Sequence, residues 1–317
     1  MLGAGLYILN STVTVPADSA LCVTGRDTVS SADITRLLPP ATPGQLHFQQ
    51  YGGLLQLKSL QLEGRATDSS AASSGGGVVI RRSANGTEDD GQPATFAALT
   101  VTFKSISPRA VANDDDPAAS LTFVNSTFLD NINTYRNNTG LGGCGISLDE
   151  ATASFAATAP AQFIGNSAPT GGIGMALRVW GGSVVFRGPV LMADNWARSG
   201  AGGAVHLYFG SNLTFDNTAA LRNNRILIGP RNFGIGGGAI YASASHITHN
   251  AAAMYINNRA GRQGGTTGGA VCLDGWVSAV GNTDCHGISG TRSSFSASQH
   301  VTFLNNTANK GGALHPA

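Results

Sequence analysis

Short runs of apolar residues alternate with turn-forming residues along most of the chain. Runs such as "LTF", "VVF", "AIYA" and "AVCL" combine β-branched, aromatic and small side chains, and Gly or Asn bounds them. Short runs of this kind are typical of β-strands. The 3.6-residue period of an amphipathic helix is hard to find over residues 119–317. The pattern therefore predicts an all-β protein built from short strands.

These runs belong to a repeated sequence motif, which is called the phrase below. An apolar residue stands three positions before an asparagine, and a pair of glycines follows, in six copies spaced by roughly 30 residues, a period typical of solenoids. The apolar residues and asparagines are Phe128–Asn131, Phe163–Asn166, Met192–Asn195, Leu221–Asn224, Tyr255–Asn258 and Phe303–Asn306. The glycine pairs are Gly142-Gly143, Gly171-Gly172, Gly202-Gly203, Gly237-Gly238, Gly268-Gly269 and Gly311-Gly312.

Each part of the phrase has a physical role in a stack of coils. We expect the aromatic side chains to fill the interior and the asparagine amides to hydrogen-bond from coil to coil. The glycine pair allows a sharp turn where a Cβ atom would clash, and the small residue after it fits a narrow corner. The small residues are Cys144, Ala204, Ala239, Ala270 and Ala313, with Ile173 as the exception.

The phrase divides the chain into two parts. Residues 119–317 contain the repeats, whereas residues 1–118 have strand-like runs separated by longer polar segments. We interpret residues 1–118 as earlier coils of the same solenoid with long loops, and a separate β domain is the alternative. The last residues resemble an unfinished coil, because a solenoid needs a polar cap. We therefore expect the sequence to be part of a longer chain.

The composition argues against two classes of protein, nucleic-acid-binding proteins and proteins with membrane-spanning helices. Only 12% of the residues are charged and the net charge is +1, so the sequence lacks the basic patch of a nucleic-acid-binding protein. No apolar run reaches the roughly 18–20 residues of a membrane span. The start, "MLGAGLYILNSTVTVPA", has no Lys or Arg and is interpreted as a first strand rather than a signal peptide.

The combination of Phe-x-x-Asn with Gly-Gly-Ala and an aliphatic residue resembles the repeat of the chlamydial polymorphic outer-membrane proteins. The best copies are "FLNNTANKGGAL" and "FIGNSAPTGGI". The resemblance implies a right-handed parallel β-helix of the pectin-lyase-like kind. It also implies an extracellular or cell-surface protein with a structural or adhesive role. Other surface proteins or polysaccharides are the expected partners, and lateral self-assembly is a further hypothesis, since few charges would oppose it.

A carbohydrate-active enzyme, a polysaccharide lyase or glycosidase, is the alternative on the same fold. Polygalacturonase-like elements occur in "GNTDCHG", but Asn282-Thr283-Asp284 and His286 are packed into one loop, whereas the enzymes spread such signatures over successive coils. Asp114–Asp116 is interpreted as a solvated turn rather than a weak Ca²⁺ site. His246 and His249 are interpreted as strand-edge residues. We therefore predict no catalytic residue, cofactor or metal.

The four cysteines limit the possible disulfides. Cys22 and Cys144 fall on coils too far apart to bond, because a disulfide needs Cα atoms within about 7 Å. Cys272 and Cys285 are predicted to pair across a loop, and Cys144 is interpreted as a buried thiol in a small-residue corner.

Six sequons are candidate glycosylation sites in a secreted protein. Asn85 is the best candidate because its loop looks exposed, while Asn125 and Asn305 are alternatively turn-forming ladder residues. The sequons are at Asn10, Asn85, Asn125, Asn137, Asn212 and Asn305.

Overall fold

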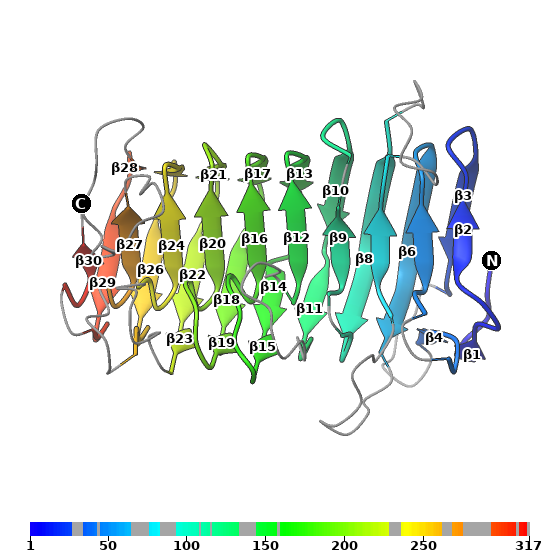
Figure 1. Cartoon of the computed structure of the whole chain (residues 1–317), viewed down its shortest axis with the longest axis horizontal. Coiled ribbons are helices and arrows are strands. Elements are labelled where there is room, and N and C mark those ends of the chain that lie inside the picture. Colours follow the sequence, from blue (N-terminus) through cyan, green and yellow to red (C-terminus); the bar gives the residue numbers. More distant parts are fainter. Residues whose placement is uncertain are drawn as a thin grey trace.

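The computed structural model is an elongated stack of coils with the two chain termini at opposite ends (Figure 1). All strand pairing is parallel, and the described residues contain no helix, hence none long and apolar enough to span a membrane. The predicted all-β parallel β-helix is confirmed. The structure describes residues 1–26, 34–42, 45–64, 76–82, 93–107, 109–114, 116–132, 144–156, 159–227, 236–261, 268–274, 293–308 and 311–315.

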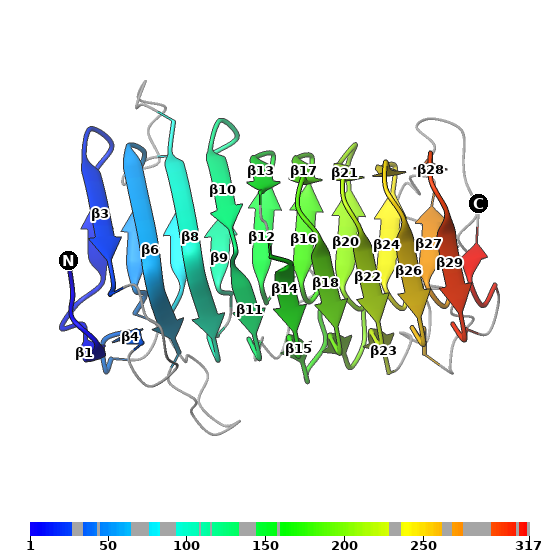
Figure 2. The same cartoon turned by 180° about the vertical axis from the view of Figure 1, so that it is seen from behind.

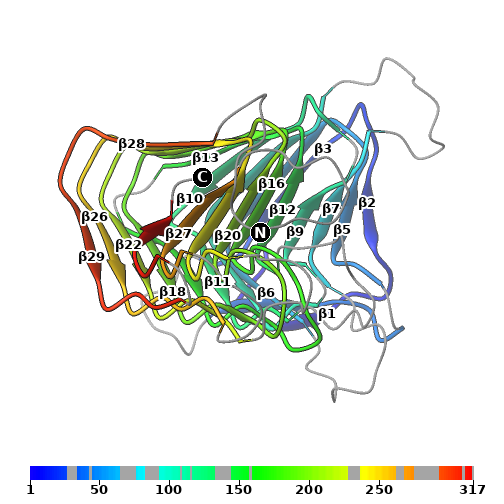
Figure 3. The same ribbon diagram turned by 60° about the vertical axis from the view of Figure 1, so that its left-hand side comes forward.

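One coil in the middle of the stack shows the construction. The chain runs through β16 (Leu177–Trp180), β17 (Ser183–Phe186), β18 (Val190–Ala193) and the short β19 (Trp196–Ala197) before the next coil begins. Each strand pairs with its counterpart one coil later, so that Leu177 lies beside Val205. The coils therefore build separate walls around one axis, as Figure 3 shows.

Three sheets form these walls. The ten-stranded sheet faces the viewer in Figure 1 and the 17-stranded sheet in Figure 2. The ten-stranded sheet contains β2 (Val13–Val15), β5 (Phe48–Gln50), β7 (Val78–Ile80), β9 (Val111–Asn113), β12 (Ile146–Asp149), β16, β20 (Val205–Tyr208), β24 (Ile240–Ser243), β27 (Val271–Asp274) and β30 (Leu314–His315). The three-stranded sheet contains β15 (Ser167–Ala168), β19 and β23 (Arg225–Ile226).

The 17-stranded sheet runs through both parts of the chain, since the strand Thr95–Lys104 pairs with Leu54–Glu63 before it and with Ser120–Val124 and Thr127–Leu129 after it. Its strands are β1 (Gly5–Ile8), β3 (Ala20–Thr24), β4 (Thr35–Leu38), β6 (Leu54–Glu63), β8 (Thr95–Lys104), β10 (Ser120–Val124), β11 (Thr127–Leu129), β13 (Thr152–Phe155), β14 (Ala161–Ile164), β17, β18, β21 (Asn212–Phe215), β22 (Ala219–Arg222), β25 (His246–His249), β26 (Ala253–Ile256), β28 (Ser294–Ala297) and β29 (Val301–Leu304).

Aromatic rings stack along the interior. Phe128 and Phe163 belong to the repeated phrase and lie face to face with centroids 4.7 Å apart. This confirms the predicted file of interior side chains. A second file that the phrase does not contain begins at Phe123 and Phe155, whose centroids are 4.7 Å apart. It continues through Phe186, Phe215, His249 and Phe295.

The six asparagines of the phrase form an unbroken ladder. The Nδ2 atoms of the first five donate to the Oδ1 atom of the asparagine on the next coil, at 2.9–3.0 Å. The Nδ2 atoms of all six donate to the carbonyl of the apolar residue one coil earlier. For Asn166 that carbonyl belongs to Phe128, at 3.1 Å. The ladder begins where the backbone N–H of Ile106 donates to Asn131. The predicted amide ladder is confirmed.

The glycine pairs turn the chain where no side chain fits. Gly237 has a φ of +76°, and a Cβ atom there would collide with the carbonyl oxygen of Ile240. A Cβ on Gly203 would collide with the carbonyl of Gly238 on the next coil. Of the small residues that follow, Cys144, Ala204, Ala239 and Ala270 are fully buried. The steric role predicted for the phrase is confirmed at these corners.

Candidate functional site

A polar cleft of about 450 Å³ lies at the carboxyl ends of three neighbouring strands of the ten-stranded sheet. The strands are β9, β12 and β16, so each coil contributes residues at the same level. Because parallel strands end at the same edge, residues far apart in sequence meet here. The cleft is lined by Asp114, Pro117, Asp149, Glu150, Arg178 and Trp180.

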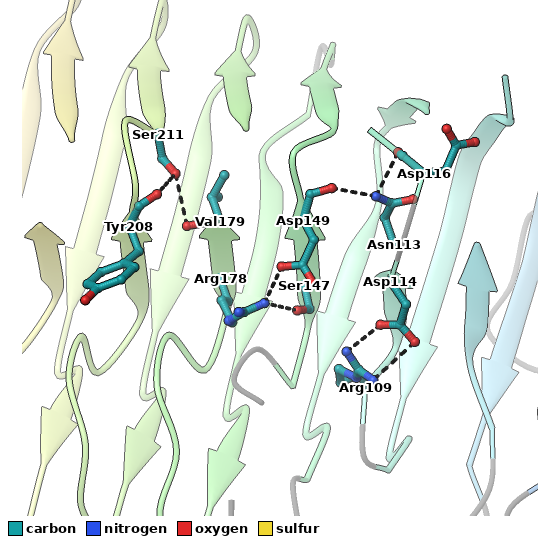
Figure 4. Close-up of polar contacts among 10 residues, drawn as sticks. All are labelled: Arg109, Asn113, Asp114, Asp116, Ser147, Asp149, Arg178, Val179, Tyr208 and Ser211. Atoms are coloured by element: carbon teal, nitrogen blue, oxygen red, sulfur yellow. Dashed lines mark hydrogen bonds and ion pairs between the residues drawn. The ribbon is translucent and has the colours of Figure 1, made fainter. Parts of the chain in front are cut away.

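Arg178 is the buried cation of the cleft. Its side chain is only 6% exposed, and its Nη1 atom donates to Oδ1 of Asp149 at 2.7 Å and to Oγ of Ser147 at 3.2 Å (Figure 4). A buried guanidinium requires such a partner, since an unpaired charge in this position would be strongly destabilising. Its Nε atom has no hydrogen-bond acceptor among the described residues. The carboxylate of Asp149 is 31% exposed and faces the cleft.

His206 lies beside Arg178 in the strand register, on β20. Burial lowers the pKa of His206 to about 3, with a smaller contribution from the positive charge of Arg178, so the imidazole is neutral at physiological pH. The ring stacks on Tyr241 with centroids 5.2 Å apart. A neutral imidazole therefore lies beside Arg178, and no second positive charge is placed next to the guanidinium.

Asp114 lies at the other end of the cleft. Its two carboxylate oxygens accept hydrogen bonds from Arg109 at 2.8 and 3.5 Å, as Figure 4 shows, and Arg81 approaches to 3.8 Å. The neighbouring Asn113 donates from Nδ2 to the backbone carbonyls of Asp116 and Asp149 and so fastens two coils together. The carboxylates are thus fixed in position before any ligand arrives.

The interpretation of Asp114–Asp116 as a solvated turn is wrong for Asp116, while Asp114 is half-buried. Asp116 is 3% exposed, and its carboxylate accepts hydrogen bonds from the backbone N–H groups of Ala94 and Ala118. Asp114 is ion-paired with arginine. Neither role could be recognised from the "DDD" run alone, because the partners, among them Ala94 and Arg109, lie outside the run.

Aromatic rings border the cleft. Trp180 has its ring centroid 4.9 Å from that of Tyr208 and 4.3 Å from that of Phe209. Phe209 is 39% exposed and has a φ of 52°, a conformation unusual for a bulky residue. The Cζ atom of Arg178 lies 5.3 Å from the Trp180 ring centroid. The cleft therefore combines an apolar ring surface with fixed hydrogen-bond donors and acceptors.

A model of the Chlamydia polymorphic membrane protein repeat matches residues 300–315. Residues 300–315 are thus similar to this repeat. No curated protein and no solved structure matches the chain. The resemblance to the family is confirmed over the matched residues, which contain Phe303, Asn306 and the pair Gly311-Gly312.

The geometry explains the spacing within the polymorphic membrane protein repeat. Asn306 accepts at Oδ1 from Nδ2 of Asn258 at 3.0 Å and donates to the carbonyl of Tyr255 at 2.8 Å. Asn305, directly before it, has a φ of 53°. The same left-handed turn precedes every ladder asparagine, at Asp130, Gly165, Asp194, Asn223, Asn257 and Asn305.

The four described sequon asparagines lie apart from the cleft. Asn10, Asn212 and Asn305 are exposed, and Asn125 is half-buried. Asn125 and Asn305 occupy left-handed turns, as the turn interpretation expected, but neither belongs to the ladder. Asn85 and Asn137 lie outside the described residues.

Cys22 and Cys144 are not bonded to each other: Cys22 Sγ lies 3.3 Å from Oε1 of Gln56, and Cys144 Sγ lies 3.0 Å from the carbonyl oxygen of Ser167. Cys144 is buried in its corner, as expected. Cys272 is buried, but Cys285 lies outside the described residues, so their pairing stays a prediction.

The enzyme-like loop also lies outside the described residues, including Asn282, Thr283, Asp284 and His286. The strand-edge interpretation is wrong for His249. It lies on β25, which is paired on both sides, and its ring is fully buried in the second aromatic file.

Sequence analysis missed Arg178 and Trp180. The only local signal is the segment "LRVW", in which a charge and a large aromatic residue alternate with apolar residues in a chain that is 12% charged. That alternation is typical of a strand with a polar outer face.

Proposed function

We propose that the protein is a rigid structural and adhesive solenoid exposed at the cell surface, and that its cleft binds a polysaccharide. The observation that carries the binding role is the cleft itself, which is lined by Trp180 and by two aspartates that mostly buried arginines hold in place. The regular stack supplies a stiff support for such a site. The match to a membrane protein repeat supports the surface location.

The chemistry of the cleft suits a sugar chain. Aromatic faces attract the C–H groups of a sugar ring, and Trp180 offers such a face beside polar groups. Carboxylate oxygens of Asp114 and Asp149 accept hydrogen bonds from hydroxyl groups. These groups are held by their own partners, so little ordering cost remains for binding.

Other roles rest on the same scaffold. Contacts with other surface proteins and lateral self-assembly remain proposals, supported by the low proportion of charged residues. Glycosylation at the exposed sequons is likewise proposed for a secreted form. Labelling of intact cells with an antibody against the chain tests the location, because a surface protein is labelled without permeabilisation.

A carbohydrate-active enzyme is the second candidate. Three carboxylates from two successive coils, those of Asp114, Asp149 and Glu150, line one cleft. Two of them accept hydrogen bonds from arginines, an arrangement that suits fixed binding groups better than groups that exchange protons. We therefore favour binding without turnover.

Binding to an array of immobilised polysaccharides tests the proposal. We expect wild type to bind, and both Trp180→Ala and Asp149→Asn to lose at least about tenfold in affinity, equivalent to about 1.4 kcal/mol. Met254→Ala, at a side chain 47% exposed on β26 of the other large sheet, is the control and should bind like wild type. Release of reducing ends or unsaturated products from the bound polysaccharide would instead establish the enzyme.

A further inference from the structure

A second cleft, of about 370 Å³, lies along the corner formed by the asparagine ladder. Its residues lie next to β19 and β23, which Figure 1 draws near the lower edge, whereas the first cleft is lined by residues at the carboxyl ends of β12 and β16. The two clefts share no residue. The second cleft is lined by Asp194, Asn223, Arg225, Asn257 and Arg259.

Two arginines occupy equivalent positions on successive coils here. Arg225 and Arg259 each follow a ladder asparagine and face each other through a parallel β-bridge. Adjacent strands lie about 4.8 Å apart, and like charges placed directly opposite each other repel. Neither arginine forms an ion pair with any described residue. An anion between them would remove this repulsion.

In the second cleft the aspartate is bound by an asparagine, so the two guanidinium groups can bind a ligand. Among the described lining residues the carboxylate is that of Asp194, which accepts a hydrogen bond from Nδ2 of Asn223 at 3.1 Å. The guanidinium of Arg225 lies over the Trp196 ring, with Cζ 6.0 Å from the centroid, which limits its rotamers. Asn223 and Asn257 both hold left-handed turns and present exposed amides that can donate to oxygen.

We propose that this second cleft binds the sulfate or carboxylate groups of an acidic polysaccharide. Guanidinium groups match such planar or multidentate oxyanions with paired hydrogen bonds. The two arginines are aligned along the solenoid axis, and exposed Arg222 lies close by at the end of β22, so the positive charge extends along the surface. A polymer with repeated anionic groups fits this line better than a single small ion. The inference does not rest on the first cleft or on its ligand.

The experiment measures binding of the full chain to immobilised heparin, a sulfated polysaccharide, with hyaluronan as the carboxylated and dextran as the uncharged comparison. We expect binding to heparin or hyaluronan that weakens with salt, and none to dextran. The double variant R225Q/R259Q should bind at least about tenfold more weakly. The variant R225K/R259K keeps both charges but not the paired hydrogen bonds, so it should lie between the two.

The matched control R82Q/R187Q removes two exposed arginines elsewhere and should bind like wild type. Thermal melting followed by circular dichroism checks that each variant is folded. Equal binding by R225Q/R259Q and wild type, or equal loss in R82Q/R187Q, would overturn the proposal. Calorimetric binding of sodium sulfate without binding of either acidic polymer would also overturn it and leave a free anion as the ligand.

Discussion

The side-chain amide of Asn166 donates from Nδ2 to the Oδ1 atom of Asn195 at 2.9 Å, across two neighbouring coils. The same Oδ1 atom also accepts from the backbone N–H of Asn166, at 3.1 Å. One asparagine thus satisfies both the side chain and the backbone of the residue one coil earlier. Because both residues are fully buried, no water can replace a lost partner, and the ladder links the folding of one coil to the next.

Removing one rung should therefore be costly. In Asn195→Ala, the amide groups of Asn166 lose their acceptor and the carbonyl of Phe163 loses its donor. We expect the free energy of unfolding to fall by about 2–5 kcal/mol, because several buried polar groups are left unpaired. Chemical denaturation followed by circular dichroism measures the loss.

Asn195→Asp separates hydrogen bonding from shape. The carboxylate has the same size but cannot donate to Phe163 or Asn224, so it should destabilise at least as much as alanine. Asn212→Ala, at an exposed asparagine on β21, serves as the control and should cost little. If Asn195→Ala were as stable as Asn212→Ala, the ladder would not contribute to stability.

Two glycines with the same backbone conformation but different surroundings test whether steric exclusion of a Cβ atom requires glycine at the turns. Gly237 and Gly210 have φ values of +76° and +72°, but only at Gly237 would a Cβ atom meet backbone. Gly210→Ala should cost about 1 kcal/mol, the price of a left-handed alanine. Gly237→Ala should cost at least about 3 kcal/mol, since the corner must shift. Similar thermal shifts for the two variants would show that conformation alone requires these glycines.

Much of the solenoid fold can be predicted from the sequence, because the motif that builds each coil is short and repeats along the chain. Phe163 and Asn166 lie three residues apart within one phrase, so their joint role in the core and the ladder can be predicted without knowing the other coils. The second aromatic file could not be predicted in the same way. His249 continues a column of phenylalanines, and its polar ring gives no sign of that burial in the sequence.

The residues that line the two clefts could not be predicted from the sequence for a different reason. Asp114, Asp149 and Trp180 meet only because their coils stack in one register. The number of residues per coil varies with the loops, so spacing along the chain does not reveal which side chains share a level. Arg225 and Arg259 are an exception in principle, since both directly follow a ladder asparagine.

The buried histidines should make the fold sensitive to acid. Burial lowers the pKa of His249 and of His47 to about 4, from 6.5 in an exposed histidine. Between pH 6.5 and 4 the unfolded chain then binds more protons than the folded chain, so the free energy of unfolding falls as the pH drops through that window. Each of the two histidines should contribute a loss of about 3 kcal/mol over this range.

A double variant tests the contribution of His249. Its Nε2 atom shares a hydrogen bond of 2.9 Å with the hydroxyl of Tyr255, so His249→Phe is combined with Tyr255→Phe to avoid leaving a buried hydroxyl unpaired. The double variant should lose less stability than wild type between pH 6.5 and 4, by about 3 kcal/mol. His300→Gln, at an exposed histidine, controls for the loss of one histidine. An unchanged pH profile in the double variant would exclude His249 as a source of acid sensitivity.

Binding of a polysaccharide to the first cleft tests the functional account most directly. Calorimetric titration of wild type, Trp180→Ala and Met254→Ala with a polysaccharide selected on the array gives the three affinities under one condition. The account predicts saturable binding that Met254→Ala retains and Trp180→Ala weakens by at least about tenfold. Equal affinity of Trp180→Ala and wild type would contradict it, because the aromatic platform beside Arg178 and Asp149 would then take no part in recognition.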